Sequence, residues 1–218
     1  TAGAAAQVES VLVSEPANVD ALAFRALFRL NALDLDGARA DIAAGLGADP
    51  DNVALLRLSA RGEWRAGQRD LAIERLLRAA ELSLWHEDVV LDAAKALDDA
   101  GRSQQAGTLI ETALGHQPDA PQLLARLGQI RLTAGDWTGA EAAAAQLRLT
   151  GSAEAISDSE KIRVAVLRGR GQTEEAFGLM RSLADQGADL GAIAEVVNHH
   201  LAKGDPAFSE VNRYEPNS

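Results

Sequence analysis

Residues 87–118 read EDVVLDAAKALDDAGRSQQAGTLIETALGHQP, and this stretch decides the fold. Apolar residues recur every three or four positions on both sides of Gly101, which predicts two amphipathic helices joined by a tight turn. Pro118 closes the stretch, and a helix stops there because proline lacks the backbone N–H that a helix interior needs. The stretch therefore predicts one helix–turn–helix unit.

The same unit recurs along the chain with a period of 34 residues. Small residues mark the recurrence in three series: Ala38, Ala72, Ala106 and Ala140; Gly67, Gly101 and Gly135; and Ala26, Ala60, Ala94 and Gly128. The step to a further unit is 36 residues, from Ala140 to Ala176 and from Gly135 to Gly171. Recurrence in a fixed register is the signature of a helical-repeat array.

This pattern resembles the tetratricopeptide repeat, a 34-residue helix–turn–helix unit with small residues at fixed offsets and proline near its end. Two positions depart from it, since Leu33 stands where the first unit would carry glycine and Leu84 stands where the second would carry proline. The resemblance implies an all-α fold, a right-handed superhelical solenoid of stacked antiparallel helix pairs, with about five repeats plus partial terminal helices.

The register divides the chain into four parts. We expect a partial repeat with only its second helix over 1–17, four regular repeats over 19–149, a fifth repeat over 150–189, and a C-terminal helix with a capping tail over 190–218. The expected helices are 2–14, 18–32, 36–48, 52–66, 70–83, 87–100, 103–115, 120–134, 137–149, 156–169, 173–186, 190–203 and 206–213. The segment Thr150–Ser159 breaks the register and is expected to form a longer loop or a hinge.

The N-terminal end of the array is atypical. Residues 2–14 resemble a second helix without its first helix, so Val8, Val11 and Leu12 are expected to be uncovered unless another chain packs on them. This suggests a homodimer through the uncovered terminal helix. The chain starts at Thr1 rather than Met, which suggests a processed protein or a piece of a longer one.

Composition excludes several classes of function. A net charge of −11 disfavours nucleic acid and anionic membrane surfaces, which both need clustered Lys and Arg. Direct membrane insertion is not expected, because no apolar run approaches about 20 residues. Without cysteine there is no thiolate metal site and no cysteine nucleophile. No signal peptide is visible, and the compartment is left open between cytoplasm and periplasm.

Motifs for catalysis are not found. Neither a G-x-S-x-G elbow nor a Walker A loop occurs, and the glycine pairs belong to the repeat turns. His199 and His200 are adjacent, so on a helix their side chains would point about 100° apart and could not share a metal ion. We predict no catalytic residue, no cofactor and no metal, and therefore a chain that is not an enzyme.

The candidate site follows from the resemblance, which implies that the first helices of the repeats line a concave groove. The candidate groove residues are Arg57, Arg61, Trp64, Arg65, Asp88, Lys95, Asp99 and Gln129. The three arginines among them fall at i, i+4 and i+8 and form one basic stripe beside Trp64. Such a stripe suits an acidic or aromatic-containing peptide. The alternative is that Asp88, Asp92 and Asp99 of the next unit neutralise the arginines.

The leading hypothesis is a non-catalytic scaffold that binds a protein or peptide segment in this groove. The resemblance implies a bacterial assembly, secretion or envelope-type adaptor. Two alternatives stay open. One is the partner- or substrate-recruiting repeat segment of a larger multidomain enzyme, such as a glycosyltransferase or sulfotransferase, and the other is a self-association module.

Overall fold

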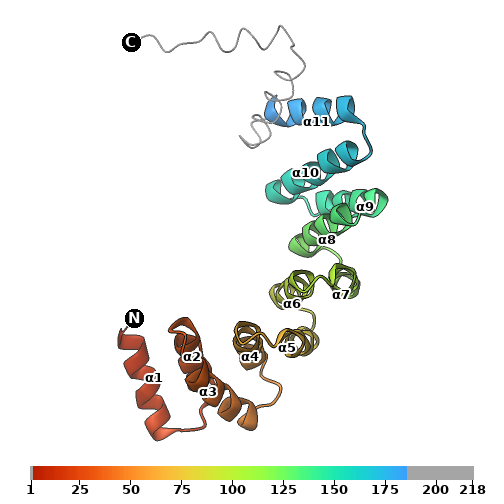
Figure 1. Ribbon diagram of the computed structural model, residues 1–218. Helices are drawn as coiled ribbons and strands as arrows, with labels where there is room; N and C mark the ends of the chain where they lie inside the picture. The colour runs from red at the N-terminus through yellow and green to blue at the C-terminus, as the bar shows by residue number, and fades with distance from the viewer. Residues whose placement is uncertain (1, 186–218) are drawn as a thin grey trace, which may run out of the picture. The chain divides into compact units, whose positions relative to one another are not determined.

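The computed structural model describes residues 2–185, and within them the chain is a series of antiparallel helices (Figure 1). The helices are α1 (Ala2–Ser14), α2 (Val19–Asn31), α3 (Leu35–Ala48), α4 (Val53–Arg65), α5 (Arg69–Leu82), α6 (Glu87–Asp99), α7 (Ser103–His116), α8 (Pro121–Thr133), α9 (Trp137–Leu149), α10 (Ala153–Gly169) and α11 (Thr173–Asp185). The expected all-α fold is confirmed for these residues. The helices expected over 190–203 and 206–213, and the tail over 190–218, lie outside the described residues.

Two compact units make up the chain, Thr1–Leu123 and Leu124–Ser218. In the first unit, α2 and α3, α4 and α5, and α6 and α7 pack as pairs, and each later pair packs on the one before it. Figure 1 shows α2, α4 and α6 along one side of this unit, with α5 and α7 on the other side. In the second unit, α10 packs against both α9 and α11.

Short polar side chains start the helices at the expected places. The side chains of Asn18, Asp34 and Asn52 each accept a hydrogen bond from a backbone N–H three residues further on, at 3.0, 2.9 and 3.1 Å. These N–H groups belong to the first turn of the helix and have no carbonyl partner within it. The caps therefore fix where α2, α3 and α4 begin.

The turn between the two helices of a pair requires a left-handed backbone. Gly67, Gly101 and Gly135 have φ angles of 79°, 76° and 72°, as the repeat predicts. Leu33 occupies the same position in the first pair with a φ of 63°, and its side chain is 73% exposed. A non-glycine residue is strained there, because its Cβ approaches the following carbonyl oxygen.

Replacing Leu33 with glycine is expected to stabilise the protein. Left-handed backbone costs a non-glycine residue about 1–2 kcal/mol, and the extra chain entropy of unfolded glycine offsets about 0.5–1 kcal/mol of the relief. We expect Leu33→Gly to raise the free energy of unfolding by about 0.5–1 kcal/mol in urea titrations. Leu33→Ala is the control, because it keeps the strain and should leave the midpoint almost unchanged. A lower midpoint for Leu33→Gly would contradict the prediction.

The expectation of a longer loop at Thr150–Ser159 is wrong. Helix α10 starts at Ala153, after Ser152 accepts a hydrogen bond from the N–H of Ala155 at 3.1 Å. The extra residues therefore lengthen the helix to 17 residues, against 13 or 14 in the other helices. The buried carboxylate of Glu160 on this longer helix forms ion pairs with Arg148 of α9 and, at 2.8 Å, with Arg163 of α10 itself.

The expectation that the apolar face of α1 is uncovered is wrong for two of its three residues. Leu12 is 7% exposed and packs with Ala21 and Leu22 of α2, and Val8 packs partly buried against the same cluster. Val11 remains 38% exposed. A homodimer through α1 stays a prediction. Its interface would have to cover Val13, which is 84% exposed.

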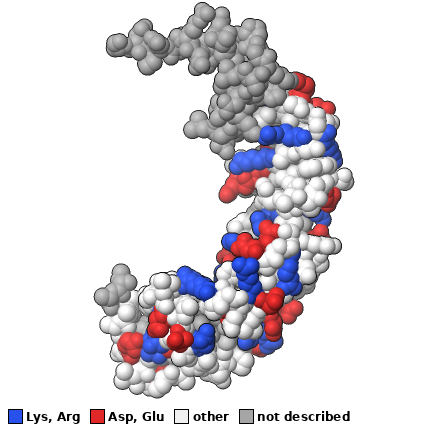
Figure 2. Space-filling view, viewed as in Figure 1, with Lys and Arg blue, Asp and Glu red and all other residues white. Residues whose placement is uncertain are grey.

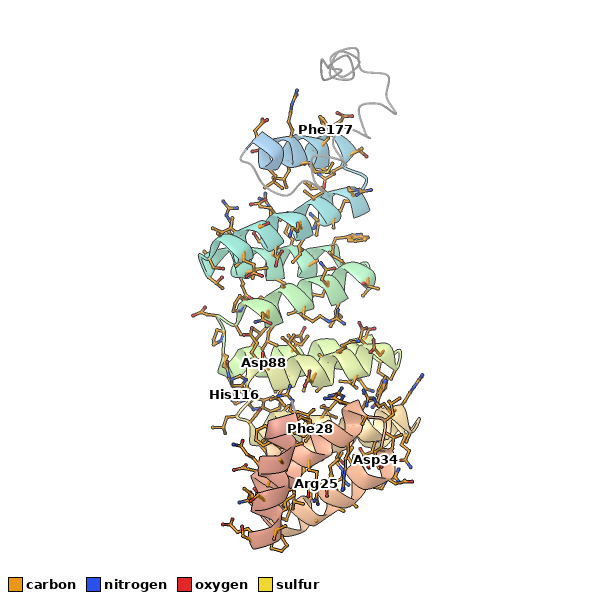
Figure 3. All side chains as sticks on the ribbon, turned by 90° about the vertical axis from the view of Figure 1, so that its left-hand side faces the viewer. Arg25, Phe28, Asp34, Asp88, His116 and Phe177 are labelled. Carbon is orange, nitrogen blue, oxygen red and sulfur yellow. The ribbon has the colours of Figure 1, made fainter. Side chains whose placement is uncertain are left out.

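Small residues permit the helices of the first unit to pack closely. The alanines of the two repeating series are 0–2% exposed there: Ala26, Ala60, Ala94, Ala38, Ala72 and Ala106. Beside them lies one buried charge, Asp41 on α3, which accepts hydrogen bonds from Arg25 of α2 at 2.7 and 3.0 Å. Arg29 also reaches Asp41 at 2.8 Å, so three side chains tie α3 to α2 (Figure 3 labels Arg25).

Candidate groove on the first unit

A hollow of the first unit lies along α2, α4 and α6, the first helices of three successive pairs. Its volume is about 850 Å³. The residues that line it are Asp20, Ala23, Phe24, Leu27, Ala54, Arg57, Leu58, Ala60, Arg61, Trp64, Arg65, Leu76, Asp92, Lys95, Ala96 and Asp99. Six of the eight predicted site residues are thus brought together: Arg57, Arg61, Trp64, Arg65, Lys95 and Asp99.

One wall of the groove is apolar. Phe24 is 57% exposed, which is unusual for a phenylalanine, while Leu27 and Leu58 are half-buried. Trp64 is also half-buried, and the guanidinium of Arg69 lies 5.6 Å from the centroid of its ring. A cation at this distance from an indole face is attracted by the ring quadrupole, so Arg69 helps to fix the orientation of Trp64.

Two of the cations in the groove are neutralised within the protein. The Nε of Arg57 donates to Asp92 at 2.8 Å, from α4 to α6, and Lys95 donates to Asp99 one turn further along α6 at 2.6 Å. Figure 2 shows acidic and basic side chains interspersed on the visible face of this unit. The alternative of internal pairing therefore applies to Arg57, and Asp99 pairs with Lys95 rather than with an arginine.

The other two arginines of the stripe have neutral partners. Arg61 donates to the side-chain oxygen of Asn31 at 2.9 Å, and Arg65 donates to the backbone carbonyl of Leu30. Both acceptors lie at the C-terminal end of α2. Within residues 2–185 neither guanidinium forms an ion pair with a carboxylate.

Two predicted site residues lie elsewhere. Asp88 is exposed at the start of α6 and does not line the groove (Figure 3). Gln129 is exposed on α8, and its position belongs to the second unit. Both were predicted from the positions that the family resemblance assigns to a groove.

The prediction also missed several residues of the lining, and Phe24 is the largest of them. Phe24 was not among the predicted residues, although it stands one period before Leu58 and two before Asp92. All three line the groove, so this repeat position faces it in three consecutive units. The regular 34-residue spacing could have identified the position, because equivalent residues of a repeat share one orientation.

The described part of the chain provides neither a metal cluster nor a membrane span. Residues 2–185 contain no group of three or more His, Asp or Glu side chains placed to hold a metal ion. None of the described helices combines the length and the hydropathy that a bilayer crossing requires.

The paired helices, glycine turns and small crossing residues define a tetratricopeptide-repeat solenoid, and comparison with solved structures confirms this fold. A tetratricopeptide repeat protein from Parabacteroides merdae has a TM-score of 0.66 at 16% identity, covering 88% of this chain and 76% of that one. YrrB has a TM-score of 0.63 at 11% identity, covering 86% and 96%. The pilus biogenesis factor PilW has a TM-score of 0.63 at 17% identity, covering 88% of both chains. No protein-family model and no curated protein sequence matches the chain.

Proposed function

We propose that the chain is a non-catalytic interaction scaffold, and that the groove along α2, α4 and α6 holds a segment of another protein. The observation that carries the proposal is the groove itself, a hollow of about 850 Å³ with an exposed Phe24 on its wall and a half-buried Trp64 in its lining. Exposed aromatic side chains in a hollow are the typical anchors of protein interfaces.

The solved relatives in fold support a role in binding and assembly. YrrB is described as a tetratricopeptide protein with an unusual peptide-binding site, and PilW as a type IV pilus biogenesis factor. We place this chain with adaptors of bacterial assembly, secretion or envelope processes on that basis.

Site-specific photo-crosslinking tests the proposal. A benzophenone amino acid at position 24 of the full chain should crosslink to a partner in cells that make the protein naturally, because position 24 lines the groove. The matched control is position 44, an exposed residue on α3 that is not part of the lining. Gel mobility and mass spectrometry would identify the products.

A second variant keeps this experiment decisive. Ala54 is exposed and lines the groove, so Ala54→Trp should fill part of it and reduce the crosslink from position 24. Equal products from positions 24 and 44, or a product from position 24 that Ala54→Trp leaves unchanged, would refute the groove as the binding surface.

A further inference from the structure

We propose that the segment held in this groove is acidic: two of its carboxylates bind Arg61 and Arg65, and an apolar side chain packs on Phe24. This inference rests on the proposed function and adds the chemistry of the partner. It follows from the balance of charge in the groove, from the spacing of the two arginines and from the apolar wall beside them.

The balance of charge leaves the groove positive beside α4. Arg57 and Lys95 are paired with Asp92 and Asp99. Among the described residues, Arg61 and Arg65 donate to the C-terminal end of α2, whose helix dipole supplies about half of one negative charge against their two positive charges. Asp20, the remaining carboxylate of the lining, lies at the N-terminal end of α2, so positive charge remains for a ligand where Arg61 and Arg65 meet the opposite end of that helix.

This local charge is opposite in sign to the chain as a whole, which carries a net charge of −11. The overall charge would favour a basic partner, but surface charges further away than about 8 Å are screened at physiological ionic strength. Recognition in the groove therefore depends on the charges that line it. Arginine is well suited to this, because its planar guanidinium can bind a carboxylate through two parallel hydrogen bonds.

The spacing of Arg61 and Arg65 defines the pattern of the ligand. Four residues of helix separate them by about 6 Å along α4. Side chains two residues apart on one face of an extended segment are about 6.6 Å apart, so carboxylates at i and i+2 match the two arginines. Phe24 and Leu27 line the groove on α2 seven and four residues before Asn31, so an apolar side chain next to the acidic pair along the segment can pack on them.

Selection from a displayed library of random decapeptides tests the inference on the full chain. Peptides retained by the protein should be enriched in Asp or Glu at i and i+2 with an apolar residue next to this acidic pair. For a synthetic peptide of the selected sequence, the double variant Arg61→Gln/Arg65→Gln should raise Kd about tenfold to a hundredfold, because charged hydrogen bonds are lost at both positions. Raising the salt concentration should weaken binding to the native chain and have less effect on the variant.

The matched control removes two positive charges as well, but at positions outside the groove. Arg39 and Arg78 are exposed and do not line it, so Arg39→Gln/Arg78→Gln should leave Kd within about twofold. Peptides selected without carboxylates, or a Kd that both double variants change equally, would overturn the acidic ligand and leave the groove proposal standing. If the native chain retains no peptide better than the Ala54→Trp variant does, the groove is not the binding surface. That result would overturn both the proposed function and this inference.

Discussion

Replacing Asp41 with alanine is expected to lower the free energy of unfolding by about 3 kcal/mol. The carboxylate is 4% exposed and binds Arg25 of α2 at 2.7 Å and Arg29 of α2 at 2.8 Å. Its removal leaves Arg25, whose side chain is 24% exposed, with only Glu9 at 3.0 Å, and leaves Arg29, whose side chain is 32% exposed, with only Asp34 at 3.7 Å among the carboxylates of the described residues. Breaking one side of a buried ion pair costs about 3–5 kcal/mol, and the partial exposure of the arginines together with their remaining partners places the expected loss at the lower end.

Titration of Arg25 should not change the stability loss caused by Asp41→Ala at pH values near neutrality. The hydrogen bond from its side chain to Asp41 is the largest cause that raises the pKa of Arg25 above its ordinary value. A cation whose pKa is raised by folding contributes stability that is fully present below its unfolded pKa and is lost only as the pH rises through the folded one. Both values are strongly alkaline, so measurements near pH 7 report the intact network.

Asp36 supplies the control on the same helix. It is 96% exposed and pairs with Arg39 at 3.2 Å, so Asp36→Ala should change the free energy of unfolding by less than about 0.5 kcal/mol. Both variants replace aspartate by alanine in α3, so their helix-propensity terms are similar in size. Urea denaturation monitored by circular dichroism measures both. Equal midpoints for the two variants would show that the buried ion pairs add no net stability.

The helices could be predicted from the sequence because the repeat supplies the same information several times. In each unit, small residues, a turn glycine and capping side chains indicate where the helices begin and end. Because the units agree, the ambiguity of a single pattern is removed. The expected helix over 87–100 and the observed Glu87–Asp99 differ by one residue. Where the register breaks, at Thr150–Ser159, this support is lost: the sequence predicts a longer loop or a hinge, whereas helix α10 already begins at Ala153.

The partners of the arginines could not be predicted in the same way. Arg57, Arg61 and Arg65 are equivalent in sequence terms, since they lie on one face of the same expected helix at equal spacing. Their partners depend on how far α4 is displaced along α2 and α6, so that one arginine reaches a carboxylate on α6 and the other two reach the end of α2. Spacing within one helix contains no information about this displacement.

The second large effect is expected from overpacking at a repeat alanine. Ala38 on α3 is 0% exposed, and α3 packs against both α2 and α4. A leucine at position 38 adds three carbon atoms where the neighbouring helices leave no free surface. Small-to-large changes in a packed core cost about 1–3 kcal/mol, and a site enclosed by two neighbouring helices is expected to lie near 3 kcal/mol.

Ala40 provides the matched comparison, because it lies two residues further along α3 and is exposed. Leucine and alanine both favour helices, so Ala40→Leu should change the free energy of unfolding by less than about 0.5 kcal/mol. The difference between Ala38→Leu and Ala40→Leu in urea denaturation therefore isolates the effect of packing. If the two variants unfold at the same urea concentration, the small residues of the repeat are not required for close packing, and their recurrence must have a different physical cause.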